Sequence, residues 1–428
     1  MDSRPNILII ISDQQRWDSL GCNGNSFVDT PNLDAMATRG ANFQLPFTPF
    51  PVCTPARASM WTGVHPNKHG VIYNRYGIDD VISYESKTKT TLFEMMRGSG
   101  YTTAYFGKWH LGEKNSGRFD VWKGFNSHGG HWEEGRQSFQ SGKYKPATQT
   151  EDMITFLESD QASEKPFLAV QSYYPPHNPF TAPIKSYERY RGKGVPFAGY
   201  YASITALDDL VGKIRDALVR TKHAENTVVF YVSDHGETFN FAETAPHKWV
   251  CQDSSIRVPF LMEGPGIPEG SSPDKFIGLE DIMPTVLSAA GIKAPESLDG
   301  KNLFDLFDGR PVNWRDSYYV QTEKRGARTL QRCIRTKKQK LILSWDEEHE
   351  FYDLLIDPEE QLNIFDAPKR DKQNQYRHFR DQTKIILKLA REMLQRAKQL
   401  EDFAGVELAS RILRQKGDEN VSKHPNPN

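Results

Sequence analysis

The segment Cys53-Thr54-Pro55-Ala56-Arg57 places a thiol, a proline and an arginine within five residues. Proline is favoured in the first turn of a helix, where its missing N–H costs no hydrogen bond, so the segment predicts a helix that begins near Cys53. The free amides and the dipole at such an N-terminus favour negative charge, and Arg57 adds a fixed cation on the same side. The segment is therefore suited to hold an anion beside Cys53, although an ordinary buried thiol is the alternative for this residue alone.

Polar residues follow four apolar runs of the chain, at residues 6–11, 101–107, 167–173 and 227–232. Runs of this kind predict buried strands. The polar residues after them are, in chain order, Asp13 and Gln14, Lys108 and His110, His177, and Asp234 and His235. Ligands of open α/β sheets lie just beyond the carboxyl ends of the strands, so these side chains are expected to meet at one edge of a sheet.

Helices are predicted between these strands, at residues 30–40, 91–100 and 200–220. The alternation predicts an α/β fold with a large, mostly parallel sheet sandwiched by helices. We expect this domain to cover residues 1–308.

Beyond residue 308 the pattern changes to shorter strands, predicted at residues 317–320, 333–336 and 340–343. They indicate a small antiparallel sheet. One apolar stripe predicts a helix over residues 375–399 that docks on the body of the protein, with dimerisation as the alternative. We expect a smaller C-terminal subdomain over residues 309–416 and a disordered tail over residues 417–428.

The first and fourth predicted strands deliver a candidate metal group, which consists of Asp13, Gln14, Asp234 and His235. Carboxylate and amide oxygens favour a hard divalent ion such as Ca²⁺, and the imidazole makes Mn²⁺ more competitive; Mg²⁺ stays open as well. An isolated Asp-Gln pair would more simply be a solvated or capping pair, but the four residues together favour a metal site.

Six segments in this order resemble the motifs of type I sulfatases of the alkaline phosphatase superfamily. They are Ile11-Ser12-Asp13-Gln14-Gln15, Cys53-Thr54-Pro55-Ala56-Arg57, Gly107-Lys108-Trp109-His110-Leu111-Gly112, Pro175-Pro176-His177, Ser233-Asp234-His235-Gly236-Glu237 and His247-Lys248-Trp249. One such motif is weak alone, whereas six in the right order are specific. The resemblance implies an alkaline-phosphatase-like fold and a sulfuric ester hydrolase.

The resemblance also implies that Cys53 is oxidised to formylglycine by a separate maturing enzyme. The modified Cys53 would then join the metal ligands, and its hydrated form would attack sulfur. Hydrolysis of a sulfate ester builds negative charge around sulfur and needs a proton for the leaving alcohol.

The cations suited to that charge are Arg57, Lys108 and Lys248, and the candidates for proton transfer are His110 and His177. By resemblance, His177 and Lys248 lie near the leaving oxygen, with His177 preferred as the acid, and His110 assists the hydrated aldehyde. The remaining histidines of the motif regions are expected to be structural or peripheral: His65, His69 and His247.

The sequence departs from the commonest family pattern at four positions. Gln14 stands where many members have a second Asp, and His235 stands where they have Asn. The metal ion then has fewer anionic ligands, so it attracts an anionic substrate more strongly. Val64-His65 stands where many relatives have Arg-Tyr, which bears on how well the maturing enzyme recognises the segment.

Substrate choice is expected in loops around the shared site. The suggestive loops are Asn74-Arg75-Tyr76, Gly129-Gly130-His131-Trp132 and Glu323-Lys324-Arg325, and the candidate substrate-binding residues in them are Arg75, Trp132 and Arg325. A small sulfated saccharide is the first choice of substrate, and an aryl or choline sulfate stays open. Ordinary solvated loops are the alternative.

Two other functions stay open. A phosphonate monoester or phosphodiester hydrolase shares, by resemblance, the fold, the oxidised Cys and this metal pattern. A glycan-binding protein without catalysis would keep the pocket but lose key residues, and here every candidate position is filled.

Composition excludes several classes of partner. Lys and Arg number 54 against 55 acidic residues, so no global field attracts nucleic acid or an anionic membrane. No apolar run approaches the ~20 residues that cross a bilayer. The four cysteines are scattered, which argues against a zinc site or a disulfide framework. No signal-peptide pattern is visible, so we expect a cytoplasmic protein, or a periplasmic one if a leader was removed. The sequence does not determine the oligomeric state of the protein.

Overall fold

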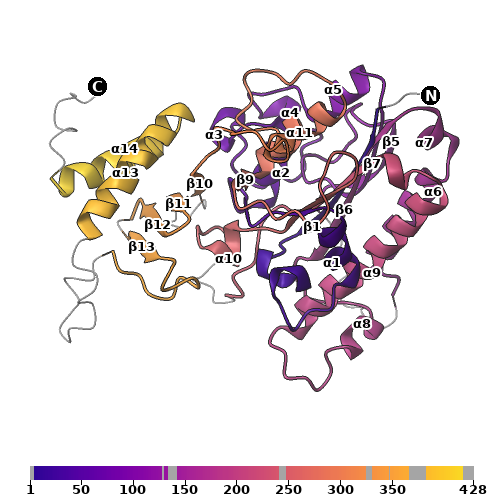
Figure 1. Ribbon diagram of the computed structural model, residues 1–428, viewed down its shortest axis with the longest axis horizontal. Helices are drawn as coiled ribbons and strands as arrows, with labels where there is room; N and C mark the ends of the chain where they lie inside the picture. The colour runs from indigo at the N-terminus through magenta and orange to yellow at the C-terminus, as the bar shows by residue number, and fades with distance from the viewer. Residues whose placement is uncertain are drawn as a thin grey trace.

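A seven-stranded sheet forms the centre of the larger part of the molecule (Figure 1). The computed structural model describes residues 4–127, 130–133, 142–240, 247–323, 330–346, 348–365 and 382–417. In spatial order the strands are β2 (Ala41–Asn42), β8 (Phe260–Glu263), β7 (Thr227–Ser233), β1 (Asn6–Asp13), β6 (Phe167–Pro176), β4 (Thr102–Lys108) and β5 (Val121–Phe125). All neighbours from β7 to β5 pair in parallel, whereas β8 is antiparallel to β7 and to β2.

The four strands predicted from apolar runs are neighbours in this sheet, in the order β7-β1-β6-β4. Because they are parallel, their carboxyl ends lie at one edge, as expected. Each strand runs slightly further than its apolar run: β1 ends at Asp13 and β6 at Pro176. The polar residues thus begin inside the hydrogen-bonded strands, and the sheet itself holds Asp13.

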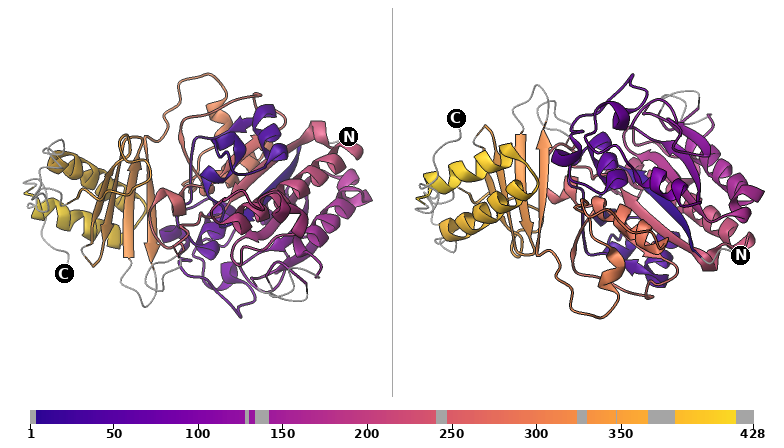
Figure 2. Two further views of the ribbon diagram at one scale, coloured as in Figure 1. Left: turned by 90° about the horizontal axis from the view of Figure 1, so that it is seen from below. Right: turned by 90° about the horizontal axis from the view of Figure 1, so that it is seen from above.

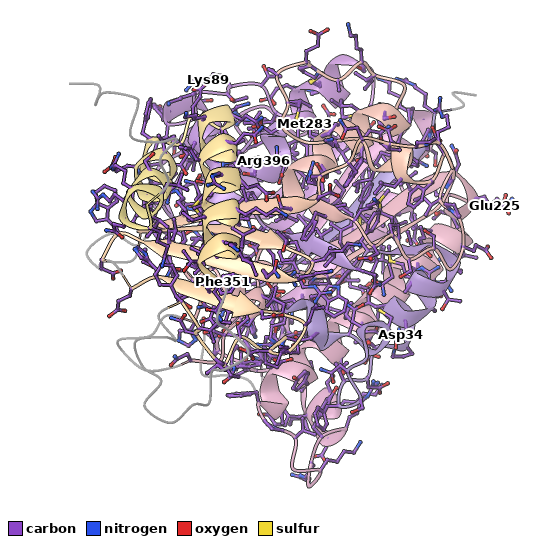
Figure 3. The ribbon with its side chains drawn as sticks, turned by 60° about the vertical axis from the view of Figure 1, so that its left-hand side comes forward. Asp34, Lys89, Glu225, Met283, Phe351 and Arg396 are labelled. Atoms are coloured by element: carbon purple, nitrogen blue, oxygen red, sulfur yellow. The ribbon has the colours of Figure 1, made fainter. Side chains whose placement is uncertain are left out.

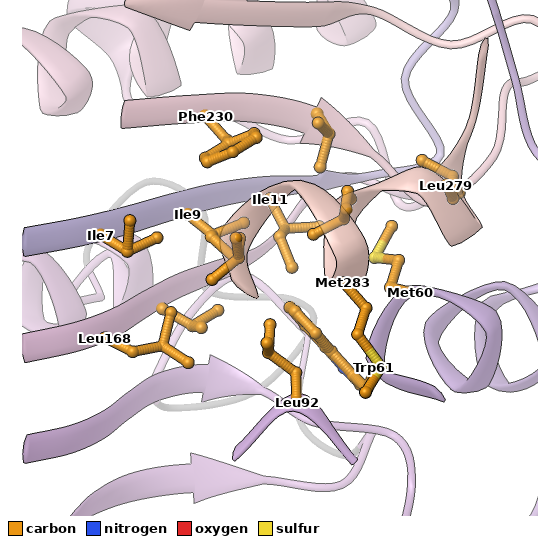
Figure 4. Packing of buried hydrophobic residues seen from close by; sticks show 14 of the residues in the cluster. Ile7, Ile9, Ile11, Met60, Trp61, Leu92, Leu168, Phe230, Leu279 and Met283 are labelled. Carbon is orange, nitrogen blue, oxygen red and sulfur yellow. The ribbon is translucent and has the colours of Figure 1, made fainter. Parts of the chain in front are cut away.

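One face of the sheet is covered by three helices, α2 (Cys53–Thr62), α5 (Leu92–Gly98) and α11 (Ile282–Ala289). Figure 4 shows Ile7, Ile9 and Ile11 of β1 pointing toward Trp61 and Met283 of the helices. Alternate residues of a strand point to opposite faces. These three isoleucines therefore serve one core, and the residues between them serve another.

The other face carries the second core, in which Leu8 and Ile10 of β1 are completely buried. Its cover consists of α1 (Pro31–Arg39), α6 (Lys145–Leu157) and α9 (Ala198–Arg220). The sequence predicted α1 and α9 closely: α1 begins at Pro31, between the flanking residues Thr30 and Gly40, and α9 ends at Arg220. With helices on both faces, β1 is apolar at every position from Ile7 to Ile11, as its burial requires.

Shorter elements connect these layers. They are the paired strands β3 (Leu45–Phe47) and β9 (Phe276–Gly278), and the helices α3 (Pro66–His69), α4 (Val81–Tyr84), α7 (Asp160–Glu164), α8 (Ile184–Glu188) and α10 (Asp253–Ile256). Among the residues with assigned positions, none belongs to a helix of the length and apolarity that crossing a membrane requires.

The C-terminal part is a four-stranded antiparallel sheet with two helices on one face. Its elements are β10 (Ser317–Glu323), β11 (Leu330–Thr336), β12 (Gln339–Ser344), β13 (Glu350–Asp353), α13 (Gln382–Gln399) and α14 (Phe403–Gln415). Both views of Figure 2 show the helices on the side of this sheet away from the larger part. In Figure 3, α13 with Arg396 lies in front of the sheet that carries Phe351.

The helix expected over residues 375–399 is described from Gln382 onward, and its docking partner differs from the prediction. Ile386 and Met393 of its apolar stripe pack on the small sheet and on α14, not on the body of the protein. The other face of the sheet meets the body through a separate cluster that includes Phe47 and Tyr318. A sheet with one face already covered still needs a partner for the second face, and α13 and α14 supply it. The expected tail beyond Gly417 lies outside the described residues.

Candidate functional site

Cys53 is the first residue of α2, where Pro55 predicted a helix start. It is 1% exposed. Asn74 caps this helix from a distant loop, because its Oδ1 accepts a hydrogen bond of 3.1 Å from the Thr54 amide. The sequence indicated Asn74 only as part of a substrate loop, since a cap from 20 residues away leaves no local signal.

Three basic side chains surround the Cys53 sulfur. Lys108 Nζ lies 3.5 Å from Sγ and Lys248 Nζ lies 3.4 Å from it. The His235 Nε2 atom is 3.2 Å from the same sulfur. Asp13 completes the group, with its Oδ1 3.7 Å from Sγ. A buried thiol with a purely structural role is neutral and gains little from neighbouring ammonium groups. The two ammonium groups beside Sγ therefore indicate that the site is suited to an anionic atom.

The pKa of the Cys53 thiol reflects a balance between burial and charge. Burial and the Asp13 carboxylate both act to raise this pKa, but Lys108, Lys248 and His235 outweigh them and lower it below its ordinary value. The direction agrees with the geometry: the site favours negative charge at position 53.

Lys108 ends β4, directly after a glycine that passes close to the backbone of β6. Gly107, the residue before it, has φ +97°, and a Cβ atom there would lie 2.0 Å from the Ser172 carbonyl oxygen. Only glycine fits such a position. Lys108 Nζ also contacts Asp13 Oδ2 at 2.6 Å, and all of these side chains are buried.

Arg57 joins the two buried carboxylates. Its Nη2 lies 3.0 Å from Asp13 Oδ2, and its Nε lies 2.9 Å from Asp234 Oδ2. The Nη1 atom donates to the Lys108 carbonyl oxygen and to Ser172 Oγ. Arg57 was expected to face the sulfate, but the structure directs all three of its nitrogens at protein atoms. Its fork of donors is suited to hold Asp13 and Asp234 side by side.

The remaining carboxylate oxygens face the other candidate ligands. One ligand atom each from Asp13, Cys53, Asp234 and His235 lies within 4.8 Å of the others. The Lys248 ammonium is already held among such donors, 2.8 Å from Gln14 Oε1 and 3.3 Å from His235 Nε2. Because a cation is accommodated here and two of the donors are carboxylates, the residues fit a divalent metal ion.

Glu237 is a residue whose role the sequence did not indicate. Its side chain is completely buried, and Oε2 accepts a hydrogen bond of 2.5 Å from Gln14 Nε2. Its other oxygen accepts from the Phe239 amide at 2.7 Å. A carboxylate only accepts hydrogen bonds, so Glu237 turns the Gln14 nitrogen toward itself and the Gln14 oxygen toward Lys248.

The two histidines proposed for proton transfer lie in different surroundings. His177 Nε2 is 3.2 Å from Lys248 Nζ and 4.0 Å from Asp13 Oδ1. Burial and Lys248 hold the pKa of His177 well below its ordinary value. Burial and Lys108 do the same to the pKa of His110, and neither ring nitrogen of His110 has a hydrogen-bond partner among the described residues. Buried polar atoms without partners are typical of sites that a ligand completes.

The other histidines lie at the periphery of this group. His69 accepts from the Val71 amide through Nδ1 and contacts Ser59 Oγ through Nε2. His65 packs against Tyr319. His247 Nδ1 lies 3.5 Å from a Glu237 oxygen, so it belongs to the surroundings of Gln14.

Of the three candidate substrate-binding residues, the two that the structure describes are engaged with other parts of the protein. Arg75 pairs with Glu85 at 2.5 Å and is 30% exposed. Trp132 was expected on a loop, but it lies in the core, where it packs on Tyr144 and donates to Thr181 Oγ1 at 3.1 Å. A ring that is 4% exposed presents no face to a ligand. Arg325 lies outside the described residues.

Comparison with known proteins decides the family. The sulfatase family profile matches residues 5–292, and the profile of the N-sulphoglucosamine sulphohydrolase C-terminal region matches residues 246–385. The chain belongs to the sulfatase family. The sulfatase is 32% identical to an ulvan-active sulfatase of Formosa agariphila over 407 residues, which are 86% of this chain and 78% of that protein.

Two solved structures share the fold of this sulfatase. One is a protein in complex with its substrate D-glucosamine-2-N,6-O-disulfate, with a TM-score of 0.76 and 21% identity over 94% of this chain and 99% of that one. The other is the phosphonate monoester hydrolase of Agrobacterium radiobacter, with a TM-score of 0.73 and 22% identity over 93% of this chain and 96% of that one. The expected α/β architecture with a small C-terminal antiparallel sheet is thereby confirmed, and the protein is a hydrolase of alkaline-phosphatase-like fold.

Proposed function

We propose that this sulfatase removes sulfate from a sulfated saccharide, using formylglycine made from Cys53 and a bound divalent cation. The observation that carries the proposal is the set of basic groups around the Cys53 sulfur: two ammonium nitrogens and one imidazole nitrogen lie within 3.5 Å. Groups placed in this way stabilise a negatively charged oxygen at position 53 and the charge that develops on sulfate.

At position 53, formylglycine formed by a maturing enzyme would supply a hydroxyl nucleophile for sulfur, and a divalent cation held beside it would act as a Lewis acid toward the surrounding oxygens. We propose Ca²⁺ as the cation, with Mn²⁺ or Mg²⁺ as alternatives, held by Asp13, Gln14, Asp234, His235 and the oxygen at position 53. Arg57 holds the Asp13 and Asp234 carboxylates in place by donating a hydrogen bond to each.

The chain's own residues divide the remaining work. Lys108 and Lys248 face the developing charge of the sulfate group. His110, kept neutral by burial and Lys108, hydrogen-bonds the reacting groups through a ring nitrogen. The proton for the leaving alcohol comes from the His177–Lys248 pair, whose Nε2 and Nζ atoms lie 3.2 Å apart. The Lys248 ammonium can donate a hydrogen bond to the His177 ring at this distance, so a proton can pass within the pair toward the leaving oxygen, as general acid catalysis requires.

A saccharide substrate is supported by the substrate of one structural neighbour, a glucosamine disulfate. The second candidate is phosphonate monoester hydrolysis, which is supported by fold likeness to such an enzyme. Loss of catalysis with retained glycan binding is disfavoured, since every position of the proposed machinery is filled. We also propose residues 1–308 as the catalytic domain and residues 309–416 as the C-terminal subdomain.

The proposal is tested by mass and by turnover. Protein co-expressed with a formylglycine-generating enzyme is expected to be lighter by ~18 Da in the peptide that contains Cys53, because sulfur is exchanged for oxygen with loss of hydrogen. The same sample is expected to release sulfate from sulfated mono- or disaccharides faster than it hydrolyses phenyl phosphonate. Faster phosphonate hydrolysis would favour the second candidate. Modified protein that binds these sugars but hydrolyses neither class of ester would indicate a binding protein.

Glu237 offers a separate test of the metal group. Replacement of Glu237 by Gln turns one of its two carboxylate acceptors into an NH₂ donor, so the Gln14 and Phe239 amides no longer each have an oxygen of their own. We therefore expect calcium affinity to fall by roughly 10- to 100-fold, as is common for residues that orient metal ligands. Calorimetric titration of chelator-treated protein with CaCl₂ measures the affinity directly.

The matched control is Glu263→Gln, the same chemical change on β8, where Glu263 pairs with Arg39 and Arg215. This variant is expected to bind calcium as the wild type does. Equal calcium affinity for Glu237→Gln and the wild type would contradict the orienting role.

A further inference from the structure

Tyr76 is an exposed aromatic residue beside the buried site. Its side chain is 55% exposed. Its ring centroid lies 5.3 Å from that of His110, with an interplanar angle of 45°. His110 in turn is 1% exposed and belongs to the group around Cys53. Tyr76 thus has one side against the site and the other toward solvent.

The charges of the site reach the Tyr76 hydroxyl. Burial raises the pKa of Tyr76, and the charges of Cys53, Lys108 and Lys248 act on it as well, the thiol upward and the two ammonium groups downward. Because Tyr76 is exposed and also contacts His110 of this group, its ring lies at the solvent-facing edge of the site.

The backbone around Tyr76 is fixed on both sides. On one side, Asn74 caps α2 through the Thr54 amide. On the other, the Gly77 amide donates to Glu113 Oε1 at 3.1 Å. Asn126 links the two, since its Nδ2 donates to Glu113 Oε1 at 2.6 Å and to the Arg75 carbonyl oxygen at 3.3 Å. A ring on such a segment loses little freedom when a ligand binds, which favours affinity.

We propose that Tyr76 is a substrate-binding residue whose ring stacks on the apolar face of the sugar that carries the sulfate ester. The inference rests on the proposed function. It assigns substrate recognition in this loop to Tyr76 instead of Arg75. Arg75 is engaged with Glu85 and lies over the Tyr73 ring. A tyrosine supplies a large, rigid contact area with few rotatable bonds and a polar end that tolerates water, which suits the rim of a sugar site.

Steady-state kinetics on D-glucosamine-2-N,6-O-disulfate test the proposal, with matured enzyme and calcium present. Tyr76→Ala is expected to raise KM about tenfold, as loss of one stacking contact would, while kcat changes less than about twofold because the ring contacts the sugar equally in the bound substrate and in the transition state. Tyr76→Phe is expected to retain the KM of the wild type, since the ring is kept. The inhibition constant of inorganic sulfate is expected to be the same in all three proteins, because sulfate has no sugar face.

Tyr84→Ala serves as the control, since Tyr84 is an equally large ring that is 73% exposed on α4. It is expected to leave KM unchanged. An unchanged KM in Tyr76→Ala, or an equal increase in Tyr76→Phe, would overturn the stacking role while saccharide desulfation by the wild type still upholds the proposed function. A rise in the sulfate inhibition constant together with KM would also overturn it, because the effect would then lie in the catalytic group. Absence of saccharide desulfation in matured wild type would overturn both proposals.

Discussion

Replacement of Cys53 by alanine is expected to lower kcat/KM for sulfate esters by at least about a thousandfold, because it removes the atom from which the nucleophile is made. The fold is expected to survive, since alanine is a good helix former and fits the space of the thiol at the start of α2. Sulfate release under single-turnover conditions measures the loss, and circular dichroism with thermal unfolding measures the fold.

The control is Cys22→Ala, which removes a thiol from a different part of the chain. Cys22 is half-buried and lies beside Asp34, and burial raises the pKa of its thiol to about 12. This variant is expected to keep full activity and the same mass shift at Cys53. Sulfate release by Cys53→Ala at more than a few per cent of the wild-type rate would exclude Cys53 as the source of the nucleophile.

Replacement of Arg57 by alanine is expected to have the largest effect on stability. Arg57 is completely buried and contacts both Asp13 and Asp234, so its removal leaves two buried carboxylates with less compensation. Breaking a buried pair from one side typically costs about 3–5 kcal/mol. Urea unfolding of chelator-treated protein measures this loss without a contribution from bound metal.

Arg57→Lys separates charge from geometry. Lysine keeps the positive charge but cannot reach Asp13, Asp234, Ser172 and the Lys108 carbonyl oxygen together. An intermediate loss of stability is therefore expected, whereas Arg97→Ala, at an exposed pair with Asp120, should cost less than about 1 kcal/mol. If Arg57→Ala unfolds at the same urea concentration as the wild type, the bridge between the carboxylates does not stabilise the fold.

The residues around Cys53 show which features of the site can be predicted from short-range sequence patterns. Pro55 predicted the start of α2, and the apolar run before Asp13 predicted a buried strand, because helix starts and strand burial depend on neighbouring residues. The direction of the Arg57 side chain could not be predicted in the same way. Its partners come from residues 13, 108, 172 and 234, and only the packing of four separate strand ends brings them within hydrogen-bond distance.

The surroundings of Trp132 and Glu237 could not be predicted from short-range sequence patterns either. An isolated tryptophan near glycines predicted a solvent-facing loop, yet the bridge to Tyr144 and the contact with Thr181 place its ring in the core. Glu237 closes one of the six motifs, but the sequence did not indicate its role, which depends on the side chain of Gln14, 223 positions away. In both cases the deciding contact is distant along the chain.

The sequence by itself determined the class of fold, the strands that end at the site, and the kinds of side chain available there, since all three follow from short-range periodicity and residue chemistry. Tertiary structure alone decided which of these side chains touch Cys53, which hold other residues in place, and which exposed aromatic ring lies against His110. Contacts between distant segments depend on how strands and helices pack, and that packing is a property of the whole chain rather than of any one segment.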